Sequence, residues 1–232
     1  MKTVFVTASG TEVGKTYVMC ALVEELDRTP LRVRVLKPVV TGFDPDGIEE
    51  SDTGRLLRAQ GLRPTAARID AVSPWRFVAA LSPDMAAERE RRRVPFEELL
   101  SFCRDSEGFD LTLIEGIGGV MVPLDERHTV SDWIAALGAP VLLVTGSYLG
   151  TLSHTLTAAE AIKARGAKLL AVIASESLEQ PVALEETRRV LERFLAPTPV
   201  VAVPRQRGVA PALAEFLPLI APYLDTEGPR HP

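Results

Sequence analysis

Cysteine is scarce in this sequence of 232 residues, and so are lysine, aromatic side chains and long apolar runs. The two cysteines, Cys20 and Cys103, have neither a paired spacing nor the spacing of zinc ligands, which argues against a disulfide framework and a zinc site. No apolar run approaches transmembrane length, and no apolar leader precedes the first strand-like segment. We therefore expect a soluble, unprocessed protein of the reducing cytoplasm.

An excess of positive charge is also missing. The net charge is -5 and the isoelectric point is near 5.4, which argues against nucleic acid or an anionic membrane as the main partner. An anionic ligand would therefore need a local cationic site. The length and the 46% hydrophobic content suit one α/β domain, which we expect over residues 1–224, with a frayed tail at 225–232.

Six short apolar runs alternate with helical patterns along the chain. The runs are continuous rather than alternating, which is typical of strands buried on both faces. Strand–helix alternation predicts right-handed βαβ units, and hence an α/β fold with a mainly parallel sheet and helices on both faces. The expected strands are 3–8, 33–39, 111–116, 141–146, 169–175 and 200–204. The expected helices are 15–28, 52–61, two within 84–105 split at Pro95, 130–137, 151–165 and 182–195.

Ligands of such sheets bind at the carboxyl ends of the strands. After the first run comes "TEVGKT", residues 11–16, which ends as a phosphate-binding loop does, although the glycine that the standard pattern requires is Ser9. A loop that leads from a buried strand into a helix directs backbone N–H groups at one spot; Lys15 adds charge for the phosphates, and Thr16 offers a hydroxyl to Mg²⁺. The alternative is that Gly14, Lys15 and Thr16 merely open a helix.

Two further strand ends carry polar residues of the same kind. Only five of the 26 basic residues are lysines, yet Lys37 joins Lys15 at a strand end, where a compact ammonium differs from a guanidinium. Glu115 and Asp52 are candidate magnesium ligands; Glu115 could instead be a solvated turn residue. Asp52 could equally cap the following helix, as could its neighbours at 51 and 53. His128 and His154 lack a catalytic partner in the sequence, so we interpret both as structural.

Several motifs, in order and over residues 4–217, closely resemble those of the dethiobiotin synthetase family, ATP-dependent ligases of biotin biosynthesis. They are "TEVGKT", "KPVVTG" followed by "SD", "EGIGG", "DW" at 132–133 and "LGTLSHTLTAAEAI" from Leu149. The resemblance implies a P-loop NTPase fold, a homodimer, and a phosphate loop one residue longer than the standard one. The leading glycine of that longer loop aligns with Ala8, which fits well only if its φ is negative.

The resemblance also implies an activity. CO₂ joins one amine of 7,8-diaminopelargonate as a carbamate, the γ-phosphoryl group of ATP is transferred to it, and the second amine closes the ring to give dethiobiotin, ADP and phosphate. The implied catalytic residues are Lys37, Lys15 and Thr11, and the implied magnesium ligands are Thr16, Asp52 and Glu115. The implied nucleotide-binding residues are Glu12, Val13, Gly14, Lys15, Thr16, Tyr17, Asp52, Glu115, Gly116, Ile117, Gly118, Ser175, Glu176, Pro204, Arg205 and Gln206. The implied substrate-binding residues are Thr11, Lys37, Thr41, Gly118, Gly150 and Thr151, the last two reaching the partner subunit's substrate.

Four residues depart from the family pattern, and three other kinds of protein compete with it. Ser175 stands where an adenine-contacting asparagine is common, Ser9-Gly10 replaces a Thr-Asp pair, and Asp84 replaces a histidine. A partition or septum-positioning ATPase of the same superfamily would carry a second lysine where Gly10 stands. A glutamine-dependent amidase would need a further domain with a nucleophilic cysteine, and a regulatory nucleotide-binding domain would share the fold without the chemistry.

Overall fold

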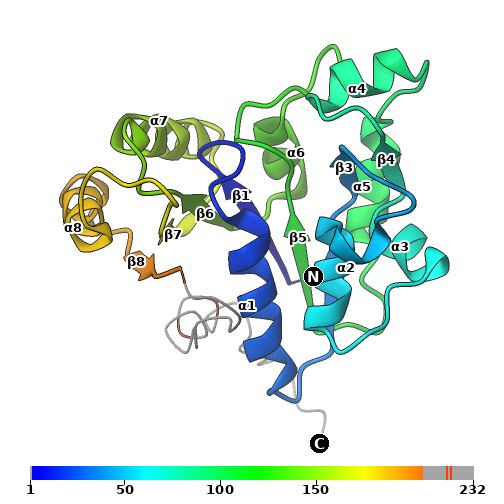
Figure 1. Ribbon diagram of the computed structural model, residues 1–232, viewed down its shortest axis with the longest axis horizontal. Helices are drawn as coiled ribbons and strands as arrows, with labels where there is room; N and C mark the ends of the chain where they lie inside the picture. Colours follow the sequence, from blue (N-terminus) through cyan, green and yellow to red (C-terminus); the bar gives the residue numbers. More distant parts are fainter. Residues whose placement is uncertain (1, 206–217, 219, 221–232) are drawn as a thin grey trace, which may run out of the picture.

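The computed structural model describes residues 2–205, 218 and 220, and its centre is a sheet of six parallel strands (Figure 1). The strands lie in the order β2-β5-β1-β6-β7-β8. Each neighbouring pair is parallel, which confirms the expected α/β class. The strand bounds are β1 (Thr3–Ala8), β2 (Val33–Leu36), β5 (Leu111–Glu115), β6 (Val141–Thr145), β7 (Leu169–Ser175) and β8 (Val200–Val203).

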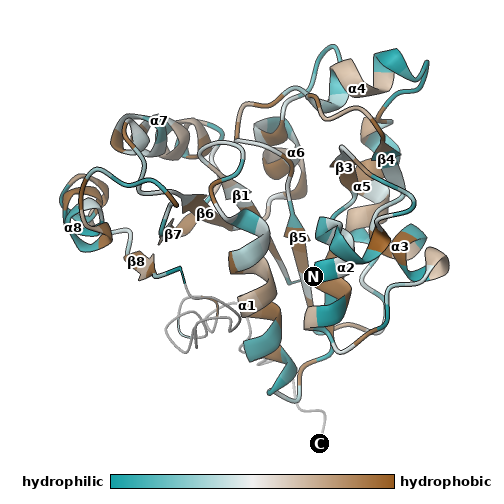
Figure 2. Ribbon diagram, viewed as in Figure 1, coloured by the Kyte–Doolittle hydropathy of each residue, from teal (hydrophilic) through white to brown (hydrophobic). Residues whose placement is uncertain are grey.

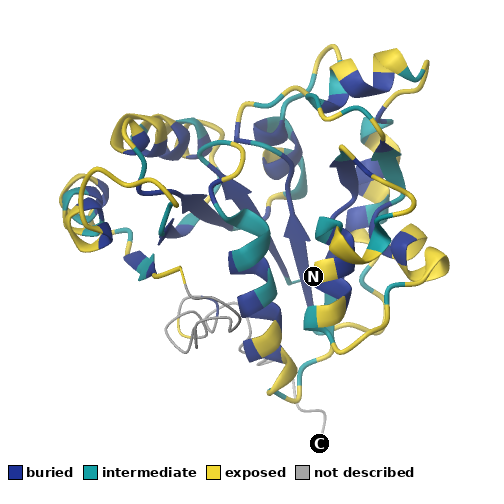
Figure 3. Cartoon of the chain, in the orientation of Figure 1, coloured by how far each residue is buried: buried dark blue, intermediate teal, exposed yellow. Residues whose placement is uncertain are grey.

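Both faces of this sheet are covered, as the continuous apolar runs predict. Along β1, Val4, Val6 and Ala8 belong to one hydrophobic core, whereas Phe5 belongs to the other and meets Trp133 edge to face at 4.8 Å. The strands are accordingly dark blue in Figure 3, while the outer helix faces are yellow and, in Figure 2, largely teal. The first core is closed by α1 (Lys15–Asp27) and α2 (Asp52–Ala59), and the second by α5 (Phe96–Arg104), α6 (Val130–Leu137), α7 (Thr151–Ala164) and α8 (Leu184–Leu195).

The run expected as one strand over 33–39 is two strands in two different sheets, so that prediction was wrong. β2 ends at Leu36, and β3 (Val39–Thr41) pairs with β4 (Trp75–Phe77) in a separate two-stranded sheet. Pro38 stands between the two strands and has no N–H to donate to a ladder, so the chain leaves the large sheet there. The strand end that carries Lys37 is therefore a bend between two sheets.

Short elements around this small sheet were not foreseen. They are β4, α3 (Ala66–Val72) and the 3₁₀ turn η1 (Ile48–Glu50), each too short for a periodic pattern to accumulate. The expected split near Pro95 is confirmed by α4 (Pro83–Arg89) and α5, with Pro95 as the N-cap of α5. The 1–224 domain limits stay a prediction, and the tail at 225–232 lies outside the described residues. None of the described helices has the length and apolar character needed to cross a bilayer.

A buried group of hydroxyls ties the loop after β1 to the first turn of α7. The Thr145 hydroxyl lies 2.8 Å from that of Ser9, 2.9 Å from that of Thr151 and 2.6 Å from that of Thr155. Thr151 also donates to the carbonyl of Gly146 at 2.7 Å. Because Thr145 contacts three other hydroxyls, it is the centre of this group.

Replacing Thr145 by Val should lower the free energy of unfolding by about 1–3 kcal/mol, since buried hydroxyl groups lose a partner. Thr7 offers the matched control. It is also fully buried, but its hydroxyl has no hydrogen-bond partner among the described residues, so Thr7→Val should be neutral or stabilising. Urea denaturation of both variants measures the difference; equal losses would contradict a stabilising role for the hydroxyl group.

Candidate active site

The carboxylate of Glu115, at the end of β5, lies at the centre of the site. Its side chain is 0% exposed, which excludes a solvated turn residue. One oxygen, Oε1, accepts a hydrogen bond from the Thr16 hydroxyl at 2.7 Å and another from Lys37 Nζ at 2.5 Å. The other oxygen, Oε2, is buried and has no partner among the described residues. A buried carboxylate oxygen without a partner is costly, so this atom is a ready acceptor for a cation.

Lys37 bridges Glu115 and Asp52. Its side chain is 3% exposed, and Nζ lies 3.0 Å from Asp52 Oδ2. Burial alone lowers the pKa of Lys37, but the two carboxylates outweigh burial and hold that pKa above its usual value. For Asp52, burial raises the pKa, and the charges of Lys37 and then Lys15 outweigh it, so the net shift is downward. Lys37 and Asp52 are therefore both charged at neutral pH.

The choice between capping residue and site residue at Asp52 is resolved by its neighbours. Ser51 is the N-cap of α2, and its side chain accepts the N–H of Gly54 at 3.0 Å. The Thr53 hydroxyl is paired with that of Ser73 at 2.7 Å. Since capping is already provided, the Asp52 carboxylate turns towards Lys37 instead.

The loop into α1 has the features of an anion site. The loop bends at Glu12 and Gly14, whose φ angles of 60° and 90° are positive. No side chain caps α1 and no acidic residue lies in its first turn, so the positive helix end is open to a ligand. Lys15 is half-buried there, and burial, followed by the charge of Lys37, lowers its pKa to about 8. An anion beside Lys15 would favour its charged form.

Two cavities flank this loop and share Glu12. The first, of about 520 Å³, is lined by Glu12, Val13, Gly14, Tyr17, Arg55, Ser175, Glu176, Ser177, Leu178 and Arg205. The second, of about 640 Å³, is lined by Thr11, Glu12, Val40, Thr41, Gly42, Phe43, Glu50, Ser51, Asp52, Ala80, Leu81, Ser82, Pro83, Ile117, Gly118 and Val122. The first thus gathers seven of the residues expected to bind nucleotide: Glu12, Val13, Gly14, Tyr17, Ser175, Glu176 and Arg205. The second gathers Thr11, Thr41 and Gly118, expected to bind substrate, but it is also lined by Asp52, Ile117 and Gly118 from the nucleotide-binding set.

Some expected residues lie elsewhere. Gly116 lines neither cavity; a Cβ there would lie 2.8 Å from the Phe5 ring, so this glycine permits close packing. Gly150 and Thr151 also line neither, and the Thr151 side chain is buried in the hydroxyl group described above. The Pro204 carbonyl accepts a long hydrogen bond from Tyr17, at 3.5 Å. Gln206 lies outside the described residues.

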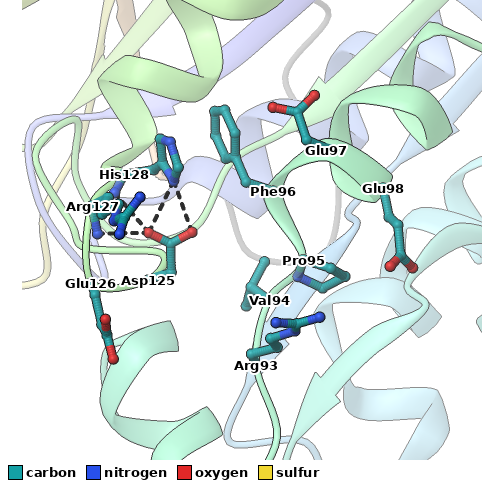
Figure 4. A pocket seen from close by; sticks show the side chains of 10 residues that line it. All are labelled: Arg93, Val94, Pro95, Phe96, Glu97, Glu98, Asp125, Glu126, Arg127 and His128. Carbon is teal, nitrogen blue, oxygen red and sulfur yellow. Dashed lines mark hydrogen bonds and ion pairs between the residues drawn. The ribbon is translucent and has the colours of Figure 1, made fainter.

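A third cavity, of about 500 Å³, shares no lining residue with the other two (Figure 4). In it, His128 Nδ1 lies 2.8 Å from Asp125 Oδ2, and the imidazole stacks on Phe96 at 3.9 Å. His154 has a partner too, because its Nδ1 lies 2.8 Å from the Tyr148 hydroxyl. Sequence reasoning missed both pairs, although the i, i+3 spacing of Asp125 and His128 was a visible signal. The third cavity lies between the start of α5 and the loop before α6. Its described lining holds no serine, threonine, cysteine or lysine, and its histidine is engaged by Asp125 and Phe96, so we interpret the cavity as structural.

Comparison with known proteins gives one consistent family. A family model described as an AAA domain matches residues 2–212. The ATP-dependent dethiobiotin synthetase BioD of Acidiphilium cryptum (strain JF-5) is 48% identical over 198 residues, which cover 84% of this chain and 89% of that protein. The protein of the same name from Caulobacter vibrioides (strain NA1000 / CB15N) is 46% identical over 208 residues, covering 88% and 93%.

Solved structures share the fold at much lower identity. A ParA family ATPase from Chlorobium tepidum TLS gives a TM-score of 0.54 at 13% identity, over 97% of both chains. A MinC:MinD cell division protein complex from Aquifex aeolicus gives 0.54 at 12% identity, over 97% of this chain and 93% of that one. These likenesses establish only the fold, whereas the sequence relatives identify the family. The chain belongs to the family of ATP-dependent dethiobiotin synthetases.

Proposed function

We infer that this protein is an ATP-dependent dethiobiotin synthetase, which carboxylates 7,8-diaminopelargonate with CO₂ and closes the ring to give dethiobiotin, ADP and phosphate. The observation that carries this inference is the 48% identity to a synthetase over 84% of the chain. The geometry agrees with it, because the buried Lys37 contacts Asp52, which lines the second cavity, and Glu115, which bonds Thr16 of the phosphate loop.

We propose that ATP binds in the first cavity with its phosphates on the loop from Glu12 to Thr16. Phosphoryl transfer through a loose transition state asks for positioned cations around the γ-phosphate rather than for a strong base. Lys15 at the open end of α1 meets that need. Without a bound anion, the Lys15 ammonium loses its proton as the pH rises above about 8. A bound polyphosphate would raise this pKa, so above that pH the binding of nucleotide would be accompanied by the uptake of a proton.

The diamine fits the second cavity. One amine nitrogen attacks the carbon of CO₂ and loses a proton, giving a carbamate; a carbamate oxygen then attacks the γ-phosphorus, and ADP leaves. The second amine attacks the activated carbonyl carbon, and phosphate leaves as the ring closes. Thr11 and Thr41 offer hydroxyls at this cavity, and the ammonium of Lys37 would stabilise the carbamate and its phosphorylated form.

The residues suit a magnesium ion. Thr16, Asp52 and Glu115 supply a hydroxyl and two carboxylates, and Glu115 Oε2 is the buried oxygen without a partner. Mg²⁺ binds through one or two carboxylates and keeps several waters. Among the described residues, no group of three or more Asp, Glu, His or Cys side chains is placed to hold a metal ion. The ion would neutralise charge on the β- and γ-phosphates.

A cytoplasmic homodimer belongs to the same proposal. Leu149 is 85% exposed and precedes Gly150 at the start of α7. An exposed leucine beside a helix N-terminus suits contact with a second copy, whose bound diamine would reach Gly150 and Thr151. Sedimentation at graded protein concentrations measures the oligomeric state.

The activity itself is tested with labelled bicarbonate, 7,8-diaminopelargonate and ATP. We expect acid-stable labelled product and ADP to form together, and only when the diamine is present. Equal rates of ATP turnover with and without the diamine would favour a switch ATPase of the same fold. Nucleotide binding without turnover would favour a regulatory domain.

The Lys37→Arg enzyme should lose as much activity as the Lys37→Ala enzyme, about 10²-fold or more in kcat/KM. The reason is that a planar guanidinium does not fit a buried site that holds a compact ammonium. Steady-state kinetics with saturating Mg²⁺ measure the loss. Lys163 provides the control, since its side chain is 43% exposed and pairs only loosely with Glu160; its Arg and Ala variants should be active. An active Lys37→Arg enzyme would reassign Lys37 to a structural role.

Glu115→Gln should raise the Mg²⁺ concentration needed for half-maximal rate more than it raises KM for the diamine. The amide keeps the shape of the side chain but loses the charge that the ion requires. Separate Mg²⁺ and diamine titrations measure the two effects. Equal shifts in both titrations would count against a metal role for Glu115, and a melting temperature near that of the wild type is needed to separate either result from unfolding.

A further inference from the structure

Arg55 is a cation of the first cavity that the sequence motifs leave without a role. It lies three residues after Asp52 on α2, so the two side chains share a helix face. Asp52 turns towards Lys37, and Arg55 lines the first cavity together with Gly14 and Tyr17. It also lines the smaller hollow between α1 and α2 that includes Thr16. Arg55 therefore borders the first turn of α1.

The guanidinium of Arg55 is only weakly engaged. Its side chain is 53% exposed, and its ion pair with Glu50 is long, at 3.7 Å. It makes no hydrogen bond within the described part of the chain. An exposed pair of that length contributes little, so the guanidinium can turn to a stronger anion at small cost.

Arg58, one turn further along α2, differs from Arg55 in two respects that bear on this cavity. It has a similar ion pair with Glu50, at 3.8 Å. However, its guanidinium also donates to the carbonyl of Glu49, and Arg58 does not line the first cavity. The two arginines thus form a matched pair that differs in access to this cavity.

The charges around the first cavity leave a place for Arg55. Its described lining includes the carboxylates of Glu12 and Glu176, the latter held by Gln180 at 2.6 Å and by the N–H of Arg205 at 2.8 Å. Lys37 is already paired with Asp52 and with the buried Glu115. Besides Lys15, the lining of this cavity therefore offers a polyphosphate two cations, Arg55 and Arg205. A guanidinium presents paired donors that match phosphate oxygens.

We propose that Arg55 is a further nucleotide-binding residue, whose guanidinium pairs with the phosphate chain of ATP and of ADP beside the first turn of α1. This inference rests on the proposed function and deepens it. In this proposal α2 contributes two residues to the site. Asp52, at the start of the helix, pairs with Lys37, and Arg55, one turn later, pairs with the nucleotide phosphates.

The test compares Arg55→Gln, Arg55→Lys and Arg58→Gln by calorimetric titration with ADP and Mg²⁺. Arg55→Gln should weaken ADP binding about threefold to tenfold, as expected for a charged contact at a half-exposed site. Arg55→Lys should recover part of the loss, and Arg58→Gln should bind within about twofold of the wild type. The KM for ATP should follow the same order, while KM for the diamine stays constant. Adenosine, which lacks phosphate, should bind all four proteins equally, and added salt should weaken ADP binding less in Arg55→Gln than in the wild type.

Three results would overturn the proposal: ADP affinity unchanged in Arg55→Gln, equal losses in Arg55→Gln and Arg58→Gln, or an equal loss for adenosine. Thermal unfolding of each variant accompanies the titrations, because a folding defect would lower the binding stoichiometry rather than the affinity. A wild-type protein that binds neither ADP nor ATP would instead overturn the proposed function, so the two failures are distinguishable.

Discussion

The buried ion pair between Lys37 and Glu115 is the interaction on which the site depends. Two charges removed from water are tolerable only when they are paired and hydrogen-bonded, so each of these side chains makes the burial of the other possible. The sheet creates the pair. In the parallel register of β2 and β5, Leu36 lies opposite Ile114, so Lys37, just after β2, and Glu115, the last residue of β5, lie at the same level. The order of the strands therefore decides the chemistry at their ends.

The pair leaves one oxygen of Glu115 without a partner among the described residues, and this oxygen can accept a ligand. Lys37 and the Thr16 hydroxyl both use Oε1 of Glu115, so Oε2 keeps its full capacity to accept. A core built only for stability would satisfy both oxygens or replace the pair with apolar side chains. The structure instead keeps an unpaired buried acceptor beside a cation and the open end of a helix. In the proposed function, a metal–polyphosphate complex would bind to this cluster through the acceptor that is already in place.

Much of this arrangement could be predicted from the sequence, because apolar runs mark buried strands and ligands gather at their carboxyl ends. The six strands of the large sheet and the meeting of Thr16, Lys37 and Glu115 follow from that rule. The small sheet was not predicted, since three-residue strands leave no periodic signal. The residues on both sides of Pro38 were also interpreted as one strand, although the chain changes sheet there. Asp52 stayed ambiguous because its neighbours are equally good caps. Arg55 was invisible because, in a chain with 21 arginines, one more carries no information until the fold gives it a cavity.

The missing glycine of the phosphate loop has a physical explanation in the same geometry. Ala8 is still part of β1, paired with Val144 of β6, so its backbone is extended and a methyl group is tolerated. The bend comes later, at Glu12 and Gly14. Close approach of the neighbouring strand end is provided by a different glycine: a Cβ on Gly119 would lie 3.3 Å from the Cα of Gly10 and 3.4 Å from the Ala8 carbonyl. Glycine is thus needed at Gly14 in the loop and at Gly119 after β5, but not at Ala8, and the start of α1 has no side-chain cap.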